Sequence, residues 1–168
     1  MNWILYYCLL KPLSWLPLGI LYPLSDVLYV VVYRLIGYRT KITRQNLSNS
    51  FPDRSLKELK AIERRYYHHL CDLLVEAIRG LHASPQEILK RYKVTNRELI
   101  NKYYENGQSV ILTSAHYNNW EWMVLSVNVQ FLHHGIGVGK PLSNKSFGAY
   151  LTKDRSRWGD EIVDQTNV

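Results

Sequence analysis

Residues 109–122 read SVILTSAHYNNWEW, and this stretch decides the fold class. Its first half, residues 109–115, is a continuous β-prone run of the kind found in buried parallel strands. The elements that follow read as a helix, a strand, a helix and a short third strand, at residues 118–129, 135–140, 144–157 and 161–164. Strands that alternate with helices predict right-handed βαβ crossovers on a parallel sheet. We therefore expect an α/β protein whose mostly parallel sheet begins with a βαβαβ unit.

The region before this run is predicted to be helical. Ser55 and Glu58 form a capping box, in which each residue satisfies a backbone N–H of the other, at the start of a long helix. Apolar residues recur at helical spacing from there to about Gly80, and we interpret this stripe as core packing. A second capping box at residues 84–87 begins a short helix.

The N-terminal region is the most hydrophobic part of the chain. Between Lys11 and Arg34 the only charged residue is Asp26, and a helix of about 20 residues would cross a bilayer core of about 30 Å. Three prolines interrupt the stretch, at positions 12, 17 and 23. One straight span, a hinged or interfacial hairpin, and a buried core helix therefore all remain open. We expect a membrane anchor and not a cleaved signal peptide, because no basic region precedes the apolar residues.

Most of the net charge of +7 lies directly after this anchor. Residues 34–65 contain nine basic and three acidic side chains, whereas residues 66–168 are nearly balanced. This position favours a basic belt at an anionic membrane surface over a nucleic-acid interface. Because basic residues next to an anchor tend to stay inside the cell, we expect the rest of the chain to lie in the cytoplasm.

The composition excludes several classes of protein. With 46% hydrophobic and 21% charged residues, the chain is neither disordered nor of low complexity. Cys8 and Cys71 both lie in apolar runs, which indicates buried thiols and no disulfide framework. The sequence contains no Cys/His cluster with zinc spacing, so we expect no metal site.

We expect three regions along the chain. Residues 1–37 are the hydrophobic anchor, residues 38–107 a basic juxtamembrane and helical region, and residues 108–168 the first part of the α/β domain. Three strands are few for a parallel sheet that needs cover on both faces, so we expect the 168 residues to be the first part of a longer polypeptide.

His116 and Glu121 form the constellation most suited to chemistry. In open α/β sheets, sites form where the carboxyl ends of strands meet the amino ends of helices, and both residues fall at such a point. The carboxylate would orient the imidazole, whose other nitrogen could then accept a proton from a hydroxyl. Asn118, Asn119 and the free amides of the helix could hold a phosphate or an oxyanion. The alternative is a histidine that ends a strand and a glutamate that complements the helix dipole.

These residues also carry a resemblance to a known family. His116 and Glu121 resemble the His-x4-acid motif of the lysophospholipid acyltransferase superfamily, and residues 119–121 (NWE) are similar to the ending of that motif in the late acyltransferases of lipid A biosynthesis, which add lauroyl or myristoyl groups in Gram-negative bacteria. Upstream, the family's post-anchor segment is similar to residues 37–39, 44–47 and 51–52, and downstream its second block resembles residues 139–144 and 155–159. The chain departs from the pattern at Asn118, where the family commonly has Gly, and at Lys140, where Arg is frequent.

The resemblance implies an acyltransferase-like fold and a membrane-anchored O-acyltransferase. The acyl chain would arrive as a thioester on acyl carrier protein, or on coenzyme A, with no further cofactor. His116, polarised by Glu121, would deprotonate a hydroxyl of a lipid A precursor or related glycolipid. Lys140, Arg155 and Arg157 would bind acceptor phosphates or the carrier protein, although a solvated helix face is the alternative for the two arginines. The implied location is the cytoplasmic side of the inner (plasma) membrane.

Other functions remain open. A lysophospholipid or aminolipid acceptor fits the same chemistry, and a non-catalytic membrane-binding module fits the basic belt. A metal hydrolase is disfavoured because one His and one Glu provide too few ligands. The other histidines, at positions 68, 69, 133 and 134, are interpreted as surface or helix-packing residues.

Overall fold

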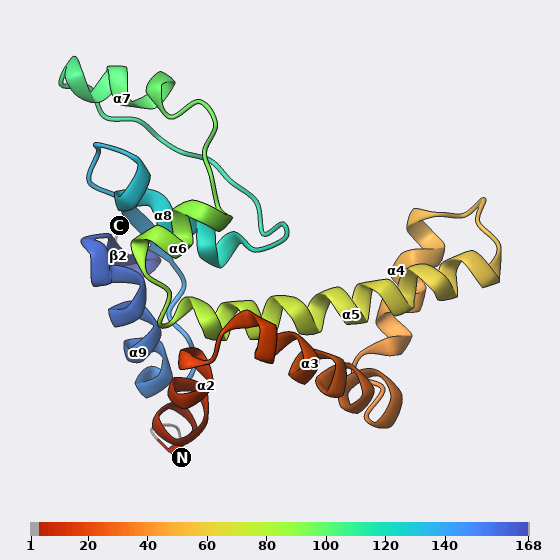
Figure 1. Ribbon diagram of the computed structural model, residues 1–168. Helices are drawn as coiled ribbons and strands as arrows, with labels where there is room; N and C mark the ends of the chain where they lie inside the picture. The colour runs from red at the N-terminus through yellow and green to blue at the C-terminus, as the bar shows by residue number, and fades with distance from the viewer. Residues whose placement is uncertain (1–3, 168) are drawn as a thin grey trace. The chain divides into compact units, whose positions relative to one another are not determined.

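The computed structural model describes residues 4–167 (Figure 1). These residues belong to two compact units, each described by itself below. Residues 16–76 form the helical unit, and residues 1–15 together with 77–168 form the sheet unit. The elements, in chain order, are η1 (Leu5–Leu10), α2 (Lys11–Trp15), α3 (Leu18–Tyr29), η2 (Val30–Leu35), α4 (Thr40–Ser50), α5 (Leu56–Gly80), α6 (Pro85–Arg91), α7 (Glu98–Glu105), α8 (Trp120–Gln130), β1 (Ile136–Gly139), α9 (Lys145–Arg155), η3 (Ser156–Trp158), β2 (Glu161–Asp164) and η4 (Gln165–Asn167).

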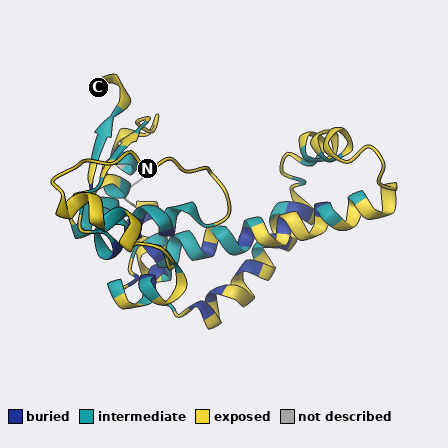
Figure 2. Ribbon diagram, turned by 90° about the horizontal axis from the view of Figure 1, so that it is seen from above, coloured by how far each residue is buried: buried dark blue, intermediate teal, exposed yellow. Residues whose placement is uncertain are grey.

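The helical unit is built on the pairing of α3 and η2 with α5. Buried residues recur every three to four positions along α3 and η2, at Leu18, Leu21, Ser25, Tyr29 and Tyr33. They face a matching stripe on α5, at residues 67, 71 and 75, in antiparallel order. In Figure 2, buried segments, drawn in dark blue, recur along the helices. The prediction that the apolar residues of the long helix pack in the core is therefore only partly correct: Leu70 packs against this core, whereas Leu56, Tyr66 and Leu74 are exposed.

The proline pattern determines where the N-terminal helices begin and end. The chain breaks at Pro17, which has an extended ψ of 152° and precedes α3. Pro23 lies inside α3, and the helix continues through it. One helix, Leu18–Leu35, is long and apolar enough to cross a membrane by length and composition, with 28% of its residues buried in the structure. The helical path is thus interrupted at Pro17, and of the three alternatives for this stretch the single straight span from Lys11 to Arg34 is not formed.

The first predicted capping box is confirmed in both hydrogen bonds, and the second in its N-cap hydrogen bond alone. The Glu58 carboxylate accepts from the backbone N–H of Ser55 at 2.9 Å, and the Glu58 N–H donates to Ser55 Oγ at 3.3 Å. At the second box, the Glu87 N–H donates to Ser84 Oγ at 3.2 Å, where α6 begins. These local signals place the amino ends of α5 and α6 as predicted.

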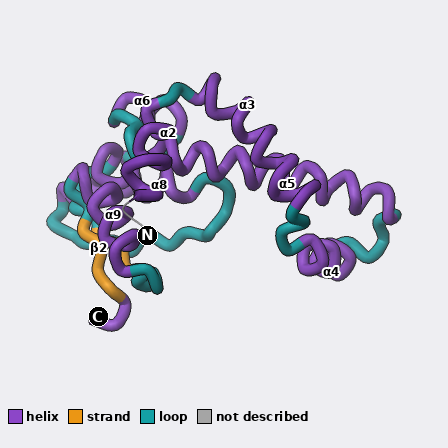
Figure 3. Tube along the Cα trace, turned by 90° about the horizontal axis from the view of Figure 1, so that it is seen from below, coloured by secondary structure: helices purple, strands orange, loops and turns teal. Residues whose placement is uncertain are grey.

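The sheet unit contains a short parallel sheet. β1 and β2 pair in parallel, with Ile136 opposite Glu161 and Gly139 opposite Asp164, and α9 connects them. The two strands are drawn in orange in Figure 3. Ala83, Ile88, Trp122 and Leu125 form a core that joins α6 to α8. The described chain is therefore mostly helical with a small parallel sheet, which agrees with the predicted helices and strands of residues 118–164.

The strand predicted at residues 109–115 is not formed. These residues are exposed and have no strand partner in the described chain, and Ile111 is 95% exposed. A buried parallel strand requires a neighbouring strand to satisfy its backbone, and β1 pairs only with β2 among residues 4–167. The prediction of a βαβαβ unit is corrected to a single βαβ unit.

The N-terminal residues of the sheet unit pack against α9. The Tyr6 ring stacks on Tyr150 with 4.5 Å between centroids, and its hydroxyl donates to Asp154 at 2.9 Å. Burial raises the pKa of Tyr6. Cys8 lies in the same segment and is exposed, so the prediction that it is a buried thiol was wrong, whereas Cys71 is buried as predicted.

Candidate functional site

His116 lies in the exposed segment that precedes α8. Its ring is 4.5 Å from that of Trp120, centroid to centroid, at an interplanar angle of 54°. Two contacts hold the segment locally: the Ser114 hydroxyl donates to Met123 Sδ at 3.0 Å, and the Tyr117 N–H donates to the Ala115 carbonyl at 2.8 Å. The imidazole is thus open to solvent at the amino end of a helix.

Asn118 and Asn119 form the turn between this segment and α8. Asn118 has a φ of 52°, in the left-handed region where glycine is favoured and asparagine is the best tolerated side chain. This backbone requirement explains why an Asn can stand where the family commonly has Gly. Asn119 is the residue at the N-cap position of α8. Their predicted role in holding a phosphate or an oxyanion stays a prediction.

Glu121 lies in the first turn of α8 and is bound by Arg155 from the end of α9. The guanidinium donates twice, from Nε at 3.2 Å and from Nη2 at 2.6 Å, to the two carboxylate oxygens. It also lies 5.6 Å from the centroid of the Trp120 ring. Among the described residues His116 makes no hydrogen bond to Glu121, and the predicted dyad stays a prediction. Arg155 therefore brings α9 to the start of α8, beside the histidine-bearing segment.

A cavity of about 440 Å³ lies at the carboxyl ends of β1 and β2, against α9. Three basic side chains line it, those of Lys140, Lys145 and Arg155, with Asp164 as the one acidic side chain in the described lining. Apart from Thr152, the remaining wall is apolar and includes Leu142, Ala149, Ile162 and Val163. The cavity thus combines cationic side chains with an apolar surface. Such a lining suits a ligand that has both an anionic group and an acyl chain.

Two of the predicted binding residues meet at this cavity, and one residue is added. Lys140 follows β1 directly, and Arg155 reaches the cavity from the end of α9. Lys145 was not predicted, although its position directly after the capping residue Asn144 placed it at the start of the helix expected next to Lys140. The sequence order, a strand, Lys140 and then a helix that starts at Lys145, is the signal that could have placed Lys145 near Lys140.

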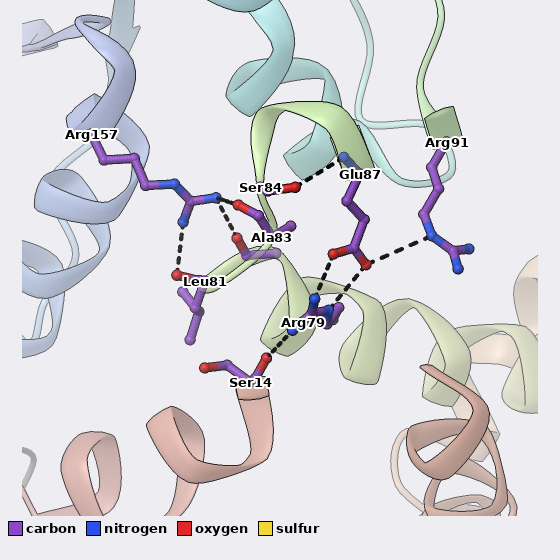
Figure 4. A network of polar contacts seen from close by, with 9 residues as sticks. Ser14, Arg79, Leu81, Ala83, Ser84, Glu87, Arg91 and Arg157 are labelled. Atoms are coloured by element: carbon purple, nitrogen blue, oxygen red, sulfur yellow. Dashed lines mark hydrogen bonds and ion pairs between the residues drawn. The ribbon is translucent and has the colours of Figure 1, made fainter. Parts of the chain in front are cut away.

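Arg157 binds backbone carbonyls at and directly after the carboxyl end of α5 (Figure 4). Its guanidinium donates to the carbonyls of Leu81, Gly80 and Ala83 at 2.8, 2.7 and 3.0 Å. It also lies 4.1 Å from the centroid of the Trp158 ring, and burial lowers the pKa of Arg157. A solvated helix face is therefore the wrong interpretation for this residue. Its predicted contact with substrate stays a prediction.

A second arginine strengthens the same junction. Arg79 donates to the Glu87 carboxylate at 3.0 and 2.5 Å and to the Ser14 carbonyl at 2.7 Å (Figure 4). Arg91 approaches the same carboxylate at 3.9 Å. These contacts tie α2, the last turn of α5 and α6 together, and they give the basic residues here a structural role.

The remaining candidate residues form no second site. His133 Nε2 donates to the Gln108 carbonyl at 3.0 Å, and His134 lies 3.7 Å from Glu161 at the surface. His68 stacks on Tyr29 in the helical unit, with 3.6 Å between ring centroids. Within the described residues, no group of three or more His, Cys, Asp or Glu side chains could hold a metal ion.

Comparisons with known proteins agree with the resemblance seen in the sequence. The family model described as bacterial lipid A biosynthesis acyltransferase matches residues 1–168. The lipid A biosynthesis lauroyltransferase of Escherichia coli strain K12 is 23% identical over 167 aligned residues, which cover 93% of this chain and 54% of the relative. The chain thus spans about half the length of the curated relative it matches, and no solved structure matches it. Because the family model extends over all 168 residues, the chain belongs to the bacterial lipid A biosynthesis acyltransferase family.

Proposed function

We propose that the full-length protein transfers a fatty acyl chain from an acyl thioester to a hydroxyl of a lipid A precursor or a related glycolipid. The observation that carries this proposal is the family match over residues 1–168. The relative named as a lauroyltransferase supports a lauroyl-type chain and a lipid A-type acceptor. The preferred donor is acyl carrier protein, with acyl coenzyme A as the alternative carrier of the same thioester.

His116 acts as the general base in this proposal. It removes the proton from the acceptor hydroxyl while the oxygen attacks the thioester carbonyl, and a tetrahedral oxyanion forms. Collapse of this intermediate breaks the carbon–sulfur bond, makes the new ester, and releases the carrier thiolate, which takes the proton back from the imidazolium. The exposure of His116 at the amino end of α8 supports this role, because both substrates must reach the ring.

Glu121 orients the base, and Arg155 holds Glu121. An ionised carboxylate has about four lone-pair sites, and the two hydrogen bonds from Arg155 occupy only part of them. The carboxylate can therefore accept from the imidazole as well. Catalytic hydrogen bonds are often long or unformed without substrate and tighten in the complex. On this account Arg155 is a positioning residue as well as part of the cavity wall.

The acceptor and the oxyanion have distinct binding groups. Lys140, Lys145 and Arg155 would take the phosphate of the acceptor in the cavity, where the apolar wall receives part of an acyl chain. The backbone amides at the start of α8, with Asn118 and Asn119, would stabilise the oxyanion next to His116. The site thus provides a base, an oxyanion binder and a phosphate binder around one helix terminus.

The protein is expected to act at the inner membrane, on its cytoplasmic side. The helix Leu18–Leu35 supports attachment, since most of its residues are not buried within the structure. The nine basic side chains of residues 34–65 are all exposed, whereas one of the three acidic side chains of this stretch, Glu63, is buried. This surface would be attracted to anionic headgroups.

The proposal is tested with full-length protein, radiolabelled acyl–acyl carrier protein and a purified lipid A precursor. We expect labelled glycolipid from the natural protein and a loss of about 10²- to 10⁴-fold for His116→Ala. Tyr117→Ala is the matched control, because Tyr117 is 83% exposed in the same segment and should leave transfer unchanged. Full transfer by His116→Ala would show that His116 is not the general base. Acylation of a lysophospholipid in place of the glycolipid would refute the proposed acceptor. Binding to vesicles with no acyl product would refute the proposed acyltransferase activity.

A further inference from the structure

The apolar helix Leu18–Leu35 is joined to α5 by polar contacts along its length. The Tyr22 hydroxyl donates to Glu76 at 2.8 Å, and the Ser25 hydroxyl donates to Asp72. The carboxylate of the next residue, Asp26, lies 3.6 Å from His68, which is one turn before Asp72 on α5. A helix that spans a bilayer alone has no need of partners of this kind, because its outward side chains contact only lipid tails.

The same pairing continues through aromatic rings at the other end of the helix. Tyr33 stacks on Tyr67 with 4.6 Å between centroids, and the Tyr67 hydroxyl donates to the Tyr38 carbonyl at 2.6 Å. With the Tyr29–His68 stacking, contacts to α5 come from four successive turns of Leu18–Leu35, and they run from Glu76 at one end of the pairing to Tyr67 at the other. The contacts all belong to one compact unit, which contains Leu18–Leu35 and residues 56–76 of α5.

The opposite face of the helix is apolar and uncovered. Ile20, Val27 and Leu35 are 55%, 59% and 75% exposed. The other exposed apolar side chains of this face are Leu24, Val30 and Val31. A continuous apolar face of this kind on a helix with polar contacts behind it is typical of a segment that lies in a membrane interface.

A spanning arrangement conflicts with these contacts. Asp26 is the ninth of the 18 residues, so it would lie near the bilayer midplane. The paired face of α5 would bring Asp72, Glu76 and His68 into the hydrocarbon with it. Ionisable side chains at that depth are costly and are rare outside functional pathways. With the helix in the plane of the membrane, all four groups stay on the aqueous side.

We propose that Leu18–Leu35 lies in the plane of one leaflet, with its uncovered apolar face in the lipid and α5 on the aqueous side. The inference rests on the membrane attachment proposed above and specifies its geometry. Arg34, Arg39 and Lys41 are exposed at the carboxyl end of the helix and beyond it. Their positive charges complement anionic headgroups at the membrane surface. The occupant of the apolar face is therefore a bilayer surface that contains anionic lipid.

The experiment measures on which side of the membrane the two ends of the helix lie. Lys11→Cys and Lys41→Cys are placed singly in the full-length protein, with the exposed Cys8 changed to Ser. The Cys8→Ser protein alone is the control, because its remaining described cysteine, Cys71, is buried and should not react. Spheroplasts and inverted membrane vesicles of the expressing bacterium are treated with a membrane-impermeant maleimide.

The in-plane arrangement predicts that both cysteines react in the same preparation. Labelling of one in spheroplasts and the other in inverted vesicles would overturn it and establish a span. Labelling of both in spheroplasts only would support the in-plane helix and refute the proposed cytoplasmic side. Protein that remains in the soluble fraction would refute the attachment itself, while a failure to transfer acyl groups would refute the proposed function and leave the geometry supported.

A depth measurement decides what covers the apolar face. Nitroxides at Leu24, Val27 and Val31 should collide with lipid-dissolved oxygen at nearly equal depths in vesicles with anionic lipid. A depth that rises to a maximum near the helix centre would overturn the proposal in favour of a span. Nitroxides shielded from both lipid-dissolved and aqueous reagents would show that protein covers this face, which would also overturn it.

Discussion

Two clusters of arginine contacts in the sheet unit show how neighbouring basic residues take different roles. At the end of α5, Arg157 and Arg79 bind backbone carbonyls and a carboxylate and hold helices together. At the cavity, Arg155 binds Glu121 and shares the lining with Lys140 and Lys145. Arg155 and Arg157 are two residues apart, yet Arg155 lines the cavity and Arg157 binds backbone carbonyls at the carboxyl end of α5. A basic residue near a candidate site therefore needs its partners identified before it is given a function.

The first prediction concerns Arg157 and has the largest expected effect on stability. Arg157→Ala leaves three backbone carbonyls without their charged donor, and the free energy of unfolding should fall by roughly 3–4 kcal/mol. Chemical denaturation of the full-length protein measures this loss, and Arg157→Lys should recover part of it. If Arg157→Ala keeps its stability but binds the acceptor less well, Arg157 would have a binding role like that of Arg155, and the proposed difference between the two arginines would be wrong.

Asp160 gives a pH dependence in the same unit, at the start of β2. It is 5% exposed, and burial raises the pKa of Asp160 from 3.8 to about 6. Between these values the folded protein binds more protons than the unfolded chain, so the free energy of unfolding should fall as pH rises. A shift of this size corresponds to about 2–3 kcal/mol.

Asp160→Asn isolates this contribution. The difference in melting temperature between the natural protein and the variant, followed from pH 4 to pH 7, should move in favour of the variant as the carboxyl group ionises in the natural protein. A difference that stays constant across that range would contradict the assignment.

Arg155 should behave in the opposite way to Arg157. Both members of its pair with Glu121 are partly exposed, at 26% and 30% of their side-chain surface, so Arg155→Ala should cost less than about 1 kcal/mol of stability. The same variant should raise the KM for the acceptor about tenfold and lower kcat as well, because Glu121 loses its anchor. Arg155→Lys, a point charge without the bidentate contact, should restore KM more than kcat. A large loss of stability with unchanged kinetics would make Arg155 a second structural arginine.

The smallest effect is expected at Lys145. Lys145→Ala removes one exposed charge from the cavity and should raise the KM for a phosphorylated acceptor by about two- to fivefold, with less effect at high salt. Lys153→Ala is the matched control, because Lys153 is exposed on the same helix and does not line the cavity. Equal effects of the two substitutions would indicate a general charge effect instead of a binding site.

The parts of the fold that depend on neighbouring residues were predicted correctly. Ser55 with Glu58, and Ser84 with Glu87, are local signals, and both helices begin where these pairs place them. β1, α9 and β2 were also predicted within a few residues, since their pairing joins segments that are close in sequence. Residues 109–115 have the composition of a strand. A strand also needs a neighbouring strand for its backbone hydrogen bonds, and the composition of the segment does not reveal whether one is present.

The candidate site was predicted in part for the same reason. Lys140 and Arg155 were identified from motifs, and the structure adds that they share a cavity with Lys145. The sequence could not separate Arg155 from Arg157, because the Glu121 carboxylate and the carbonyls at the end of α5 are brought to them by tertiary packing. The left-handed turn at Asn118 explains a departure from the family pattern that sequence comparison alone left unexplained.

The central claim is that His116 and Glu121 act as one unit in acyl transfer, and a double-mutant cycle on kcat tests it most directly. Full-length His116→Ala, Glu121→Ala and the double variant are compared with acyl–acyl carrier protein and a lipid A precursor. If Glu121 acts through His116, the double variant should be no slower than His116→Ala alone. If the two losses multiply, Glu121 acts independently through Arg155, and the oriented base would be contradicted.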